Sequence, residues 1–208
     1  MTAYTASVVL HDSKEVSVSA EPESSSPSPW ERWFFPSRRI NNEKRKGSFS
    51  EVKSTTNSEV RKGLCAFHQK NGPLQWVHDR LHKAAQEAEF GWELNPLEFI
   101  QITEYNVEKQ GGHYKRHRDI IIEQKPQRII SSVTQLSTSD SYRGSQLVFD
   151  KNSGLPNSEE IQVVGDTIFF KADEPHEVTP VQFGIRFSLV AWFTGPELWT
   201  RETLPYYF

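Results

Sequence analysis

Cysteine is almost absent from this chain of 208 residues, in which Cys65 is the single one. One cysteine excludes a disulfide within the chain and suits a reducing compartment. Long apolar runs are missing too, and the N-terminus has no basic region followed by an apolar core, which argues against a membrane span and a signal peptide. The net charge of −3 provides no general excess of basic charge for nucleic acid. We therefore expect a cytoplasmic protein with neither a membrane nor a nucleic acid as its partner.

The chain is long enough for one domain with an extension, and its composition divides it into three regions. Residues 1–29 are rich in Ser, Pro and Glu and are expected to be a disordered N-terminal extension. Residues 30–97 are expected to be an N-terminal helical support region, with a polar connection at residues 38–62 and an amphipathic helix at residues 73–88. Residues 98–200 form the remaining, strand-rich domain.

Short strands dominate this last region, and turn residues rich in Gly, Asn and Asp separate them. The predicted strands are residues 98–105, 128–137, 146–150, 161–164, 167–171, 177–181 and 185–193. Many short strands after a helix, with no helix repeating between them, indicate an antiparallel double-stranded β-helix. The predicted fold class is α+β, mainly β, with a jelly-roll or cupin-like double-stranded β-helix core and N-terminal supporting helices.

His117 and Asp119 form an H-x-D pair, and an isolated His176 follows them. On an extended segment, side chains two residues apart lie on the same face, so the pair is predicted to point at one spot. Two imidazoles and one carboxylate bind a divalent metal on three adjacent corners, as in non-haem Fe(II) oxygenases. An H-x-D pair also arises by chance in surface turns, so the surrounding pattern decides its meaning.

Arg186 lies inside a segment, residues 185–193, that is mostly apolar on both faces and is therefore expected to be a buried strand. A buried guanidinium needs an anionic partner, because an unpaired buried charge is strongly unfavourable. One face of the strand is polar and aromatic, and it carries Arg186, Ser188, Val190 and Trp192. The planar fork of an arginine beside a hydroxyl suits a ligand carboxylate, although an internal Asp or Glu would also satisfy Arg186.

These residues resemble those of the 2-oxoglutarate and Fe(II)-dependent dioxygenases, in their prolyl 4-hydroxylase-like branch. The resemblance is dense over residues 98–196. The matching motifs lie at residues 101–105, 111–117, 128–137, 142–149 and 165–170. Ser145 departs from the pattern, since that branch has glycine there, and the change removes a residue tolerant of left-handed backbone angles.

The resemblance implies an enzyme that hydroxylates a C–H bond with Fe(II), 2-oxoglutarate, O2 and L-ascorbate. It implies that His117, Asp119 and His176 bind the iron and that Arg186 binds the distal carboxylate of 2-oxoglutarate. Three further residues match positions that line the cosubstrate pocket, or else have a structural role: Tyr105, Gln135 and Ser188. The candidates for a substrate groove are Tyr142, Arg143 and Trp192, with core packing as the alternative for Trp192.

The favoured substrate is a prolyl residue in a peptide or protein, and the alternative is a free amino acid or small metabolite. A cupin-like metal-binding module without redox activity, or a zinc hydrolase, could use the same barrel, but neither needs the Arg186 anchor. A nucleic-acid demethylase of the same superfamily carries a second arginine where this chain has Trp192. His78 and His82 are spaced as neighbours on a helix, but they lack a nearby third ligand and receive no metal role.

Overall fold

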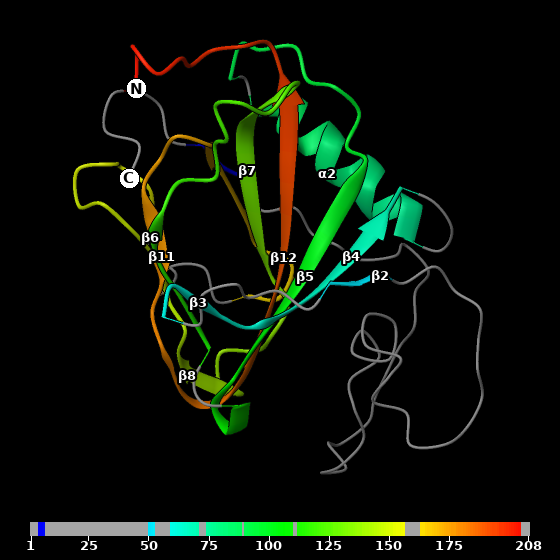
Figure 1. Cartoon of the computed structure of the whole chain (residues 1–208). Coiled ribbons are helices and arrows are strands. Elements are labelled where there is room, and N and C mark those ends of the chain that lie inside the picture. Colours follow the sequence, from blue (N-terminus) through cyan, green and yellow to red (C-terminus); the bar gives the residue numbers. More distant parts are fainter. Residues whose placement is uncertain are drawn as a thin grey trace.

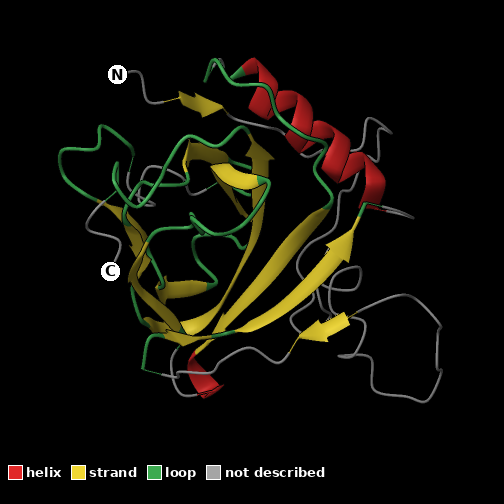
Figure 2. Cartoon of the chain, turned by 45° about the horizontal axis from the view of Figure 1, so that its top comes forward, coloured by secondary structure: helices red, strands yellow, loops and turns green. Residues whose placement is uncertain are grey.

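The computed structural model describes residues 4–6, 50–52, 59–70, 74–88, 90–109, 112–156 and 163–204. Two antiparallel sheets contain most of the regular secondary structure of these residues, and one α-helix lies against the larger sheet (Figures 1 and 2). The two sheets enclose the site described below. This arrangement is a double-stranded β-helix, so the predicted fold class is confirmed.

The major sheet has eight strands in the order β1-β10-β7-β12-β5-β4-β2, with β8 paired to one end of β12. Its strands are β1 (Tyr4–Ala6), β2 (Ser50–Val52), β4 (Leu64–Gln69), β5 (Phe99–Asn106), β7 (Gln127–Gln135), β8 (Tyr142–Gly144), β10 (Thr167–Lys171) and β12 (Val181–Gly195). The minor sheet has the order β3-β6-β11-β9. Its strands are β3 (Arg61–Lys62), β6 (His113–His117), β9 (Leu147–Phe149) and β11 (His176–Val178), and a 3-10 turn, η3 (Val107–Lys109), precedes β6.

Helix α2 (Gln75–Glu87) follows the predicted periodicity, because its buried side chains recur at helical spacing along one face. Val77, Leu81 and Ala85 of that face pack on the outer side of the major sheet. There they meet alternate residues of the central strands, including Ile102 of β5 and Leu189 of β12. No helix of the described residues is long and apolar enough to cross a membrane.

The region expected to supply supporting helices is more strand-rich than the sequence indicates. Residues 61–69 form β3 and β4, which extend the minor and the major sheet respectively. α2 is the one α-helix that the described residues contain. A sequence pattern misses β4 because only Cys65 and His68 are buried in it, so it lacks the apolar alternation of a half-buried strand.

The turn at Gly165 agrees with the sequence reading, and one predicted strand does not. Gly165 has a φ of 100° in the turn before β10, and the Asp166 amide donates to the Val163 carbonyl there at 3.0 Å. Val163 and Val164 lie in that turn and are exposed, so the described end of the predicted strand 161–164 is not a strand. Ser145 has a φ of 52°, the left-handed conformation that glycine adopts most easily.

Candidate active site

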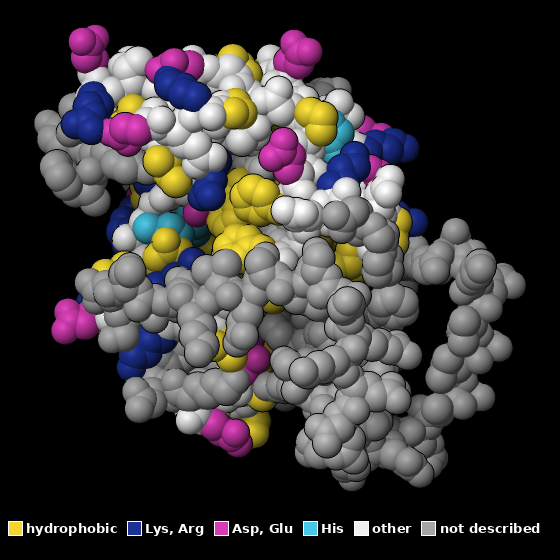
Figure 3. Space-filling view, turned by 45° about the vertical axis from the view of Figure 1, so that its right-hand side comes forward, with side chains coloured by type: hydrophobic (Ala, Val, Ile, Leu, Met, Phe, Trp, Pro, Cys, Tyr) yellow, Lys and Arg dark blue, Asp and Glu magenta, His cyan; other side chains and the backbone are white. Residues whose placement is uncertain are grey.

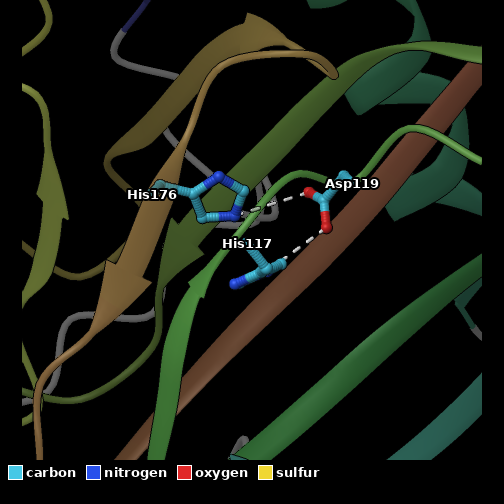
Figure 4. A group of neighbouring side chains, drawn as sticks. All are labelled: His117, Asp119 and His176. Atoms are coloured by element: carbon cyan, nitrogen blue, oxygen red, sulfur yellow. Dashed lines mark ion pairs between the residues drawn. The ribbon is translucent and has the colours of Figure 1, made fainter. Parts of the chain in front are cut away.

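His117 and His176 come from neighbouring strands of the minor sheet. His117 ends β6 and His176 begins β11, and the two residues are directly paired in the antiparallel register. Asp119 lies in a bend after β6, where its amide and that of Ile120 donate to the Ala172 carbonyl at 2.9 and 3.0 Å. The strand therefore ends before the carboxylate, and the hold on Ala172 turns Asp119 back toward the histidines (Figure 4).

The three side chains converge on one point. Their possible ligand atoms lie within 4.8 Å of one another. One carboxylate oxygen of Asp119 is 3.5 Å from Nε2 of His117, and the other is 3.6 Å from Nε2 of His176 (Figure 4). Asp119 and His176 are buried, and His117 is largely so.

The backbone sets the tautomer of both imidazoles. Nδ1 of His117 is 2.9 Å from the Lys115 carbonyl, and Nδ1 of His176 is 2.9 Å from the Glu174 carbonyl. A carbonyl oxygen only accepts, so each Nδ1 carries the proton and donates. Each Nε2 then presents its lone pair toward Asp119, which is the orientation that a metal-binding imidazole needs.

The charge states agree with a cation site. Burial lowers the pKa of His176, although Asp119 opposes the effect, so the neutral imidazole is favoured. Burial raises the pKa of Asp119, but His176 and His117 outweigh it and the pKa lies below its usual value. The Nε2 atoms of two histidines and an ionised carboxylate thus face one another, an arrangement that a divalent cation stabilises. The donor set fits Fe(II), for which two imidazoles and one carboxylate are a known combination.

Aromatic side chains hold the two imidazoles in place. The ring of Tyr114 stacks on His117 with 3.4 Å between centroids and an angle of 17° between planes. Phe170 lies edge-on to His176 at 4.8 Å, and Phe149 flanks the same ring at 5.9 Å. Because these rings leave little freedom for the histidines, the ligand atoms are preorganised.

A cavity of about 260 Å³ opens beside these residues. Its lining residues include Arg61, Gln101, Thr103, Tyr105, Tyr114, His117, Asp119, Arg128, His176, Arg186, Ser188, Val190 and Trp192. Hydrophobic, histidine and basic side chains meet near the middle of one face of the molecule (Figure 3). The predicted inner face of β12 is therefore the face that lines the cavity.

Arg186 is 2% exposed and lies deep in this cavity. Its Nε donates to the Gln135 side-chain oxygen at 3.2 Å. The Gln135 amide nitrogen is in turn held by the Ser137 carbonyl and the Tyr142 hydroxyl, each at 2.8 Å. No ion pair joins Arg186 to an acid within the described residues. The alternative of an internal carboxylate partner therefore has no support in this part of the chain, and the guanidinium can bind a ligand anion.

Tyr105 and Ser188 also line the cavity beside Arg186. Tyr105 pairs with Arg186 across β5 and β12, and Ser188 pairs with Gln135 across β12 and β7. Burial raises the pKa of Tyr105 to about 12, against the opposing charges of Arg61 and Arg186, so the phenol stays protonated and can donate. Gln135 is not among the lining residues, and its contact with the site runs through Arg186.

The three groove candidates separate in the fold. Trp192 lines the cavity, with its indole Nε1 buried and without a hydrogen-bond partner. Tyr142 and Arg143 do not line it, because β8 pairs with the far end of β12, where Arg143 lies over the ring of Phe183 at 5.6 Å.

Six polar lining residues received no role from the sequence: Arg61, Gln101, Thr103, Tyr114, Arg118 and Arg128. A signal existed for Thr103, since Gln101, Thr103 and Tyr105 alternate along β5 with apolar Ile100 and Ile102 on the other face. Arg61 and Arg128 carried no such local signal.

Residues 100–194 match the family model described as the 2OG-Fe(II) oxygenase superfamily. The match covers somewhat less than half of the chain. The matched segment contains all three converging side chains and Arg186. The resemblance noted in the sequence is thereby confirmed at the level of the superfamily.

A curated hydroxylase is similar to part of the chain. The chain is 30% identical over 94 residues to a PKHD-type hydroxylase of Pseudomonas putida strain W619. The aligned segment covers 42% of this chain and 40% of that protein. The chain thus spans well under two thirds of the length of this curated relative.

Two solved structures share the fold. A prolyl-4-hydroxylase of Pseudomonas putida has 24% identity and a TM-score of 0.53, over 68% of this chain and 77% of that one. A prolyl hydroxylase of Trichoplax adhaerens, in complex with a peptide fragment of the hypoxia inducible factor oxygen degradation domain, has 14% identity and a TM-score of 0.54, over 72% of this chain and 71% of that one. At these identities the likeness shows a shared fold.

Proposed function

We propose that this oxygenase-superfamily chain is an Fe(II)- and 2-oxoglutarate-dependent dioxygenase that hydroxylates prolyl residues in a peptide or protein. The convergence of His117, Asp119 and His176 carries the proposal, because these groups face one another inside the cavity that also contains Arg186. A metal-binding module without redox activity has no use for a buried arginine that lacks an internal acid. The shared fold of two prolyl hydroxylases supports the choice of substrate.

In this proposal His117, Asp119 and His176 are the metal ligands, and the protonated Nδ1 of each imidazole keeps its Nε2 aimed at the metal. Fe(II) bound there supplies the coupled reaction of O2 with 2-oxoglutarate and a C–H bond, which yields succinate, carbon dioxide and one hydroxyl group on the substrate. L-Ascorbate, which keeps the iron reduced, belongs to the same proposal.

Arg186 binds the distal carboxylate of 2-oxoglutarate, with two N–H groups parallel to its two oxygens. Gln135 orients the guanidinium by accepting from Nε, which leaves the outer nitrogens for the ligand. Tyr105 and Ser188 line the same cavity and provide hydroxyl donors. The apolar residues between the sheets keep water away from the reacting groups.

Trp192 is the strongest of the three groove candidates. It lines the cavity, and the guanidinium of Arg128 lies 4.2 Å from the centre of its ring. A flat ring beside a cation suits the extended backbone and pyrrolidine ring of a prolyl peptide. Tyr142 and Arg143 lie outside the lining, so we expect their effect on the substrate to be smaller.

The metal is tested with His176→Ala. We expect loss of iron binding and of 2-oxoglutarate-dependent succinate release, while the far-ultraviolet circular dichroism is unchanged. His113→Ala is the matched control, because His113 belongs to the same sheet and does not line the cavity. Full succinate release by His176→Ala would exclude this metal site.

The substrate class is tested by adding proline-rich peptides to the iron-loaded protein. We expect succinate release to rise, the peptide to gain one oxygen atom by mass spectrometry, and Trp192→Ala to reduce the peptide-stimulated rate more than the rate without peptide. If a free amino acid is hydroxylated and no prolyl peptide is, the proposed dioxygenase activity stands and the proposed prolyl substrate is wrong. Omission of ascorbate is expected to shorten the time over which turnover is linear.

A further inference from the structure

The cavity carries more positive charge than the proposed reaction needs. Four arginines line it, whereas Asp119 is the one carboxylate among the lining residues in the described part of the chain. These arginines are Arg61, Arg118, Arg128 and Arg186. The charges of a divalent iron and of the two carboxylates of 2-oxoglutarate cancel, so they leave this excess unchanged. The second substrate therefore enters a strongly cationic space.

Three of the arginines have neighbours that account for them. Arg186 has the cosubstrate as its proposed partner. Arg118 lies near Asp173 and Glu174, where it opposes the rise in the pKa of both carboxyls that burial causes. Arg128 lies over Trp192 and reaches the Asp119 backbone carbonyl at 3.4 Å.

Arg61 is the exception. Its Nη2 donates to Cys65 Sγ at 2.9 Å, its guanidinium lies 4.7 Å from the centre of the Tyr114 ring, and its Nε is buried without a partner. No ion pair joins it to a carboxylate within the described residues. Burial raises the pKa of Cys65 despite the nearby arginine, so the sulfur is a neutral thiol that does not compensate the charge.

The position of Arg61 is as informative as its charge. Arg61 pairs with Tyr114 across β3 and β6, and Tyr114 stacks on His117. The guanidinium is thus separated from a proposed metal ligand by one aromatic ring. Arg61 and the three proposed metal ligands line the same cavity, so one substrate molecule in it can contact Arg61 and reach the metal site.

We infer that Arg61 binds a carboxylate of the second substrate and so selects an acidic substrate for this cavity. The inference rests on the proposed function, since it concerns the molecule that the dioxygenase hydroxylates. The carboxylate has two possible sources. One is a Glu or Asp side chain next to the target residue of a peptide, and the other is the α-carboxylate of a free amino acid.

The test measures binding without turnover. The protein is loaded with Zn(II) in place of iron and with 2-oxoglutarate, and it is titrated by calorimetry with acetyl-Glu-Pro-Glu-amide, with acetyl-Gln-Pro-Gln-amide and with free L-proline. We expect the Glu peptide or free proline to bind at least tenfold more tightly than the uncharged Gln peptide. Preference for the Glu peptide assigns the carboxylate to a peptide side chain, and preference for free proline assigns it to an amino acid.

Variants then connect the preference to Arg61. Arg61→Gln is expected to remove the tenfold preference, and Arg61→Lys to retain part of it, whereas the affinity for 2-oxoglutarate stays as in the wild type. Arg80→Gln is the control for a general change in charge, because Arg80 lies on α2 over the ring of Trp76 and does not line the cavity. Thermal unfolding of each variant shows whether the fold is intact.

Several outcomes overturn the inference. The wild type alone overturns it if it binds charged and uncharged probes with equal affinity, or if it binds no acidic probe. A selective loss of 2-oxoglutarate affinity in Arg61→Gln would assign Arg61 to the cosubstrate instead. Succinate release by the iron-loaded wild type is measured in parallel. If succinate is released but acidic probes are not preferred, the role of Arg61 is wrong and the dioxygenase proposal stands. If acidic probes are preferred through Arg61 but no succinate is released, the dioxygenase proposal is wrong and the acid-binding role of Arg61 stands.

Discussion

The two faces of strand β12 differ in what they bury. The outer face places Phe187, Leu189, Ala191 and Phe193 in one apolar core with α2, each of them 2% exposed or less. The inner face places Arg186, Ser188, Val190 and Trp192 in the cavity. Consecutive residues thus serve opposite environments, because strand side chains alternate between the two faces of a sheet.

The outer face is mostly apolar, whereas the inner face carries charged and polar groups. On the outer side, apolar side chains of the helix and the sheet fill most of the interface, although the imidazoles of His68 and His78 are also buried there. On the inner side, Trp192 Nε1 and Arg61 Nε are buried without hydrogen-bond partners, and Arg186 has one neutral acceptor, Gln135. The difference shows that the outer face stabilises the fold, while the inner face is shaped for molecules that are not part of the chain.

The largest expected effect is on the outer face. Phe193→Ala removes a fully buried ring and is expected to reduce the free energy of unfolding by about 3–5 kcal/mol. Trp192→Ala, one residue away, should cost clearly less, because half-buried Trp192 faces a cavity rather than a packed core. Urea unfolding of both variants measures the difference. Equal losses would mean that the cavity face is as important for stability as the core face.

The next effect is on the inner face and concerns binding. Arg186→Leu is expected to weaken 2-oxoglutarate binding by more than tenfold, since loss of one partner of a buried charged pair costs roughly 2–5 kcal/mol. The free energy of unfolding should stay the same or increase, because an apolar side chain replaces a buried cation. Iron binding should persist. Calorimetric titration with 2-oxoglutarate gives the answer, and wild-type affinity would remove Arg186 from the cosubstrate site.

The smallest of the three effects is a pH dependence under α2. His68 pairs with Ile100 across β4 and β5 and shares its outer face. Burial, with repulsion from His78, lowers the pKa of His68 from 6.5 to about 4. The unfolded chain therefore binds the proton more readily, so the stability from neutral His68 is complete above pH 6.5 and is lost as the pH falls toward 4.

Between about pH 7.5 and about pH 5 this amounts to a loss of up to about 2 kcal/mol in the free energy of unfolding. Urea unfolding at both pH values measures it, and His68→Leu should make the dependence shallower. The dependence would persist in part, because burial also lowers the pKa of His78 and of His82. An unchanged slope in His68→Leu would show that His68 is not the titrating group.

Patterns within a few residues were enough to predict much of this molecule. The 3.6-residue period of α2 and the two-residue period of β12 were both visible, because each depends on the geometry of a single element. The choice of His117, Asp119 and His176 also followed from residue type, spacing and resemblance, and the three side chains do converge. The roles assigned to them remain predictions until metal binding is measured.

Contacts between distant segments were decided by the tertiary structure alone. Asp119 leaves its strand and is brought back by the Ala172 carbonyl, and Gln135 reaches Arg186 across 51 residues of chain. Arg61 enters the cavity because β3 adds to the edge of the minor sheet beside Tyr114. The alternation of side chains along a strand predicts which face of the sheet a side chain occupies. Strand pairing determines which residue lies opposite it. The sequence by itself therefore determined the ligand types and the polarity of each face, and the fold determined which polar groups the cavity brings together.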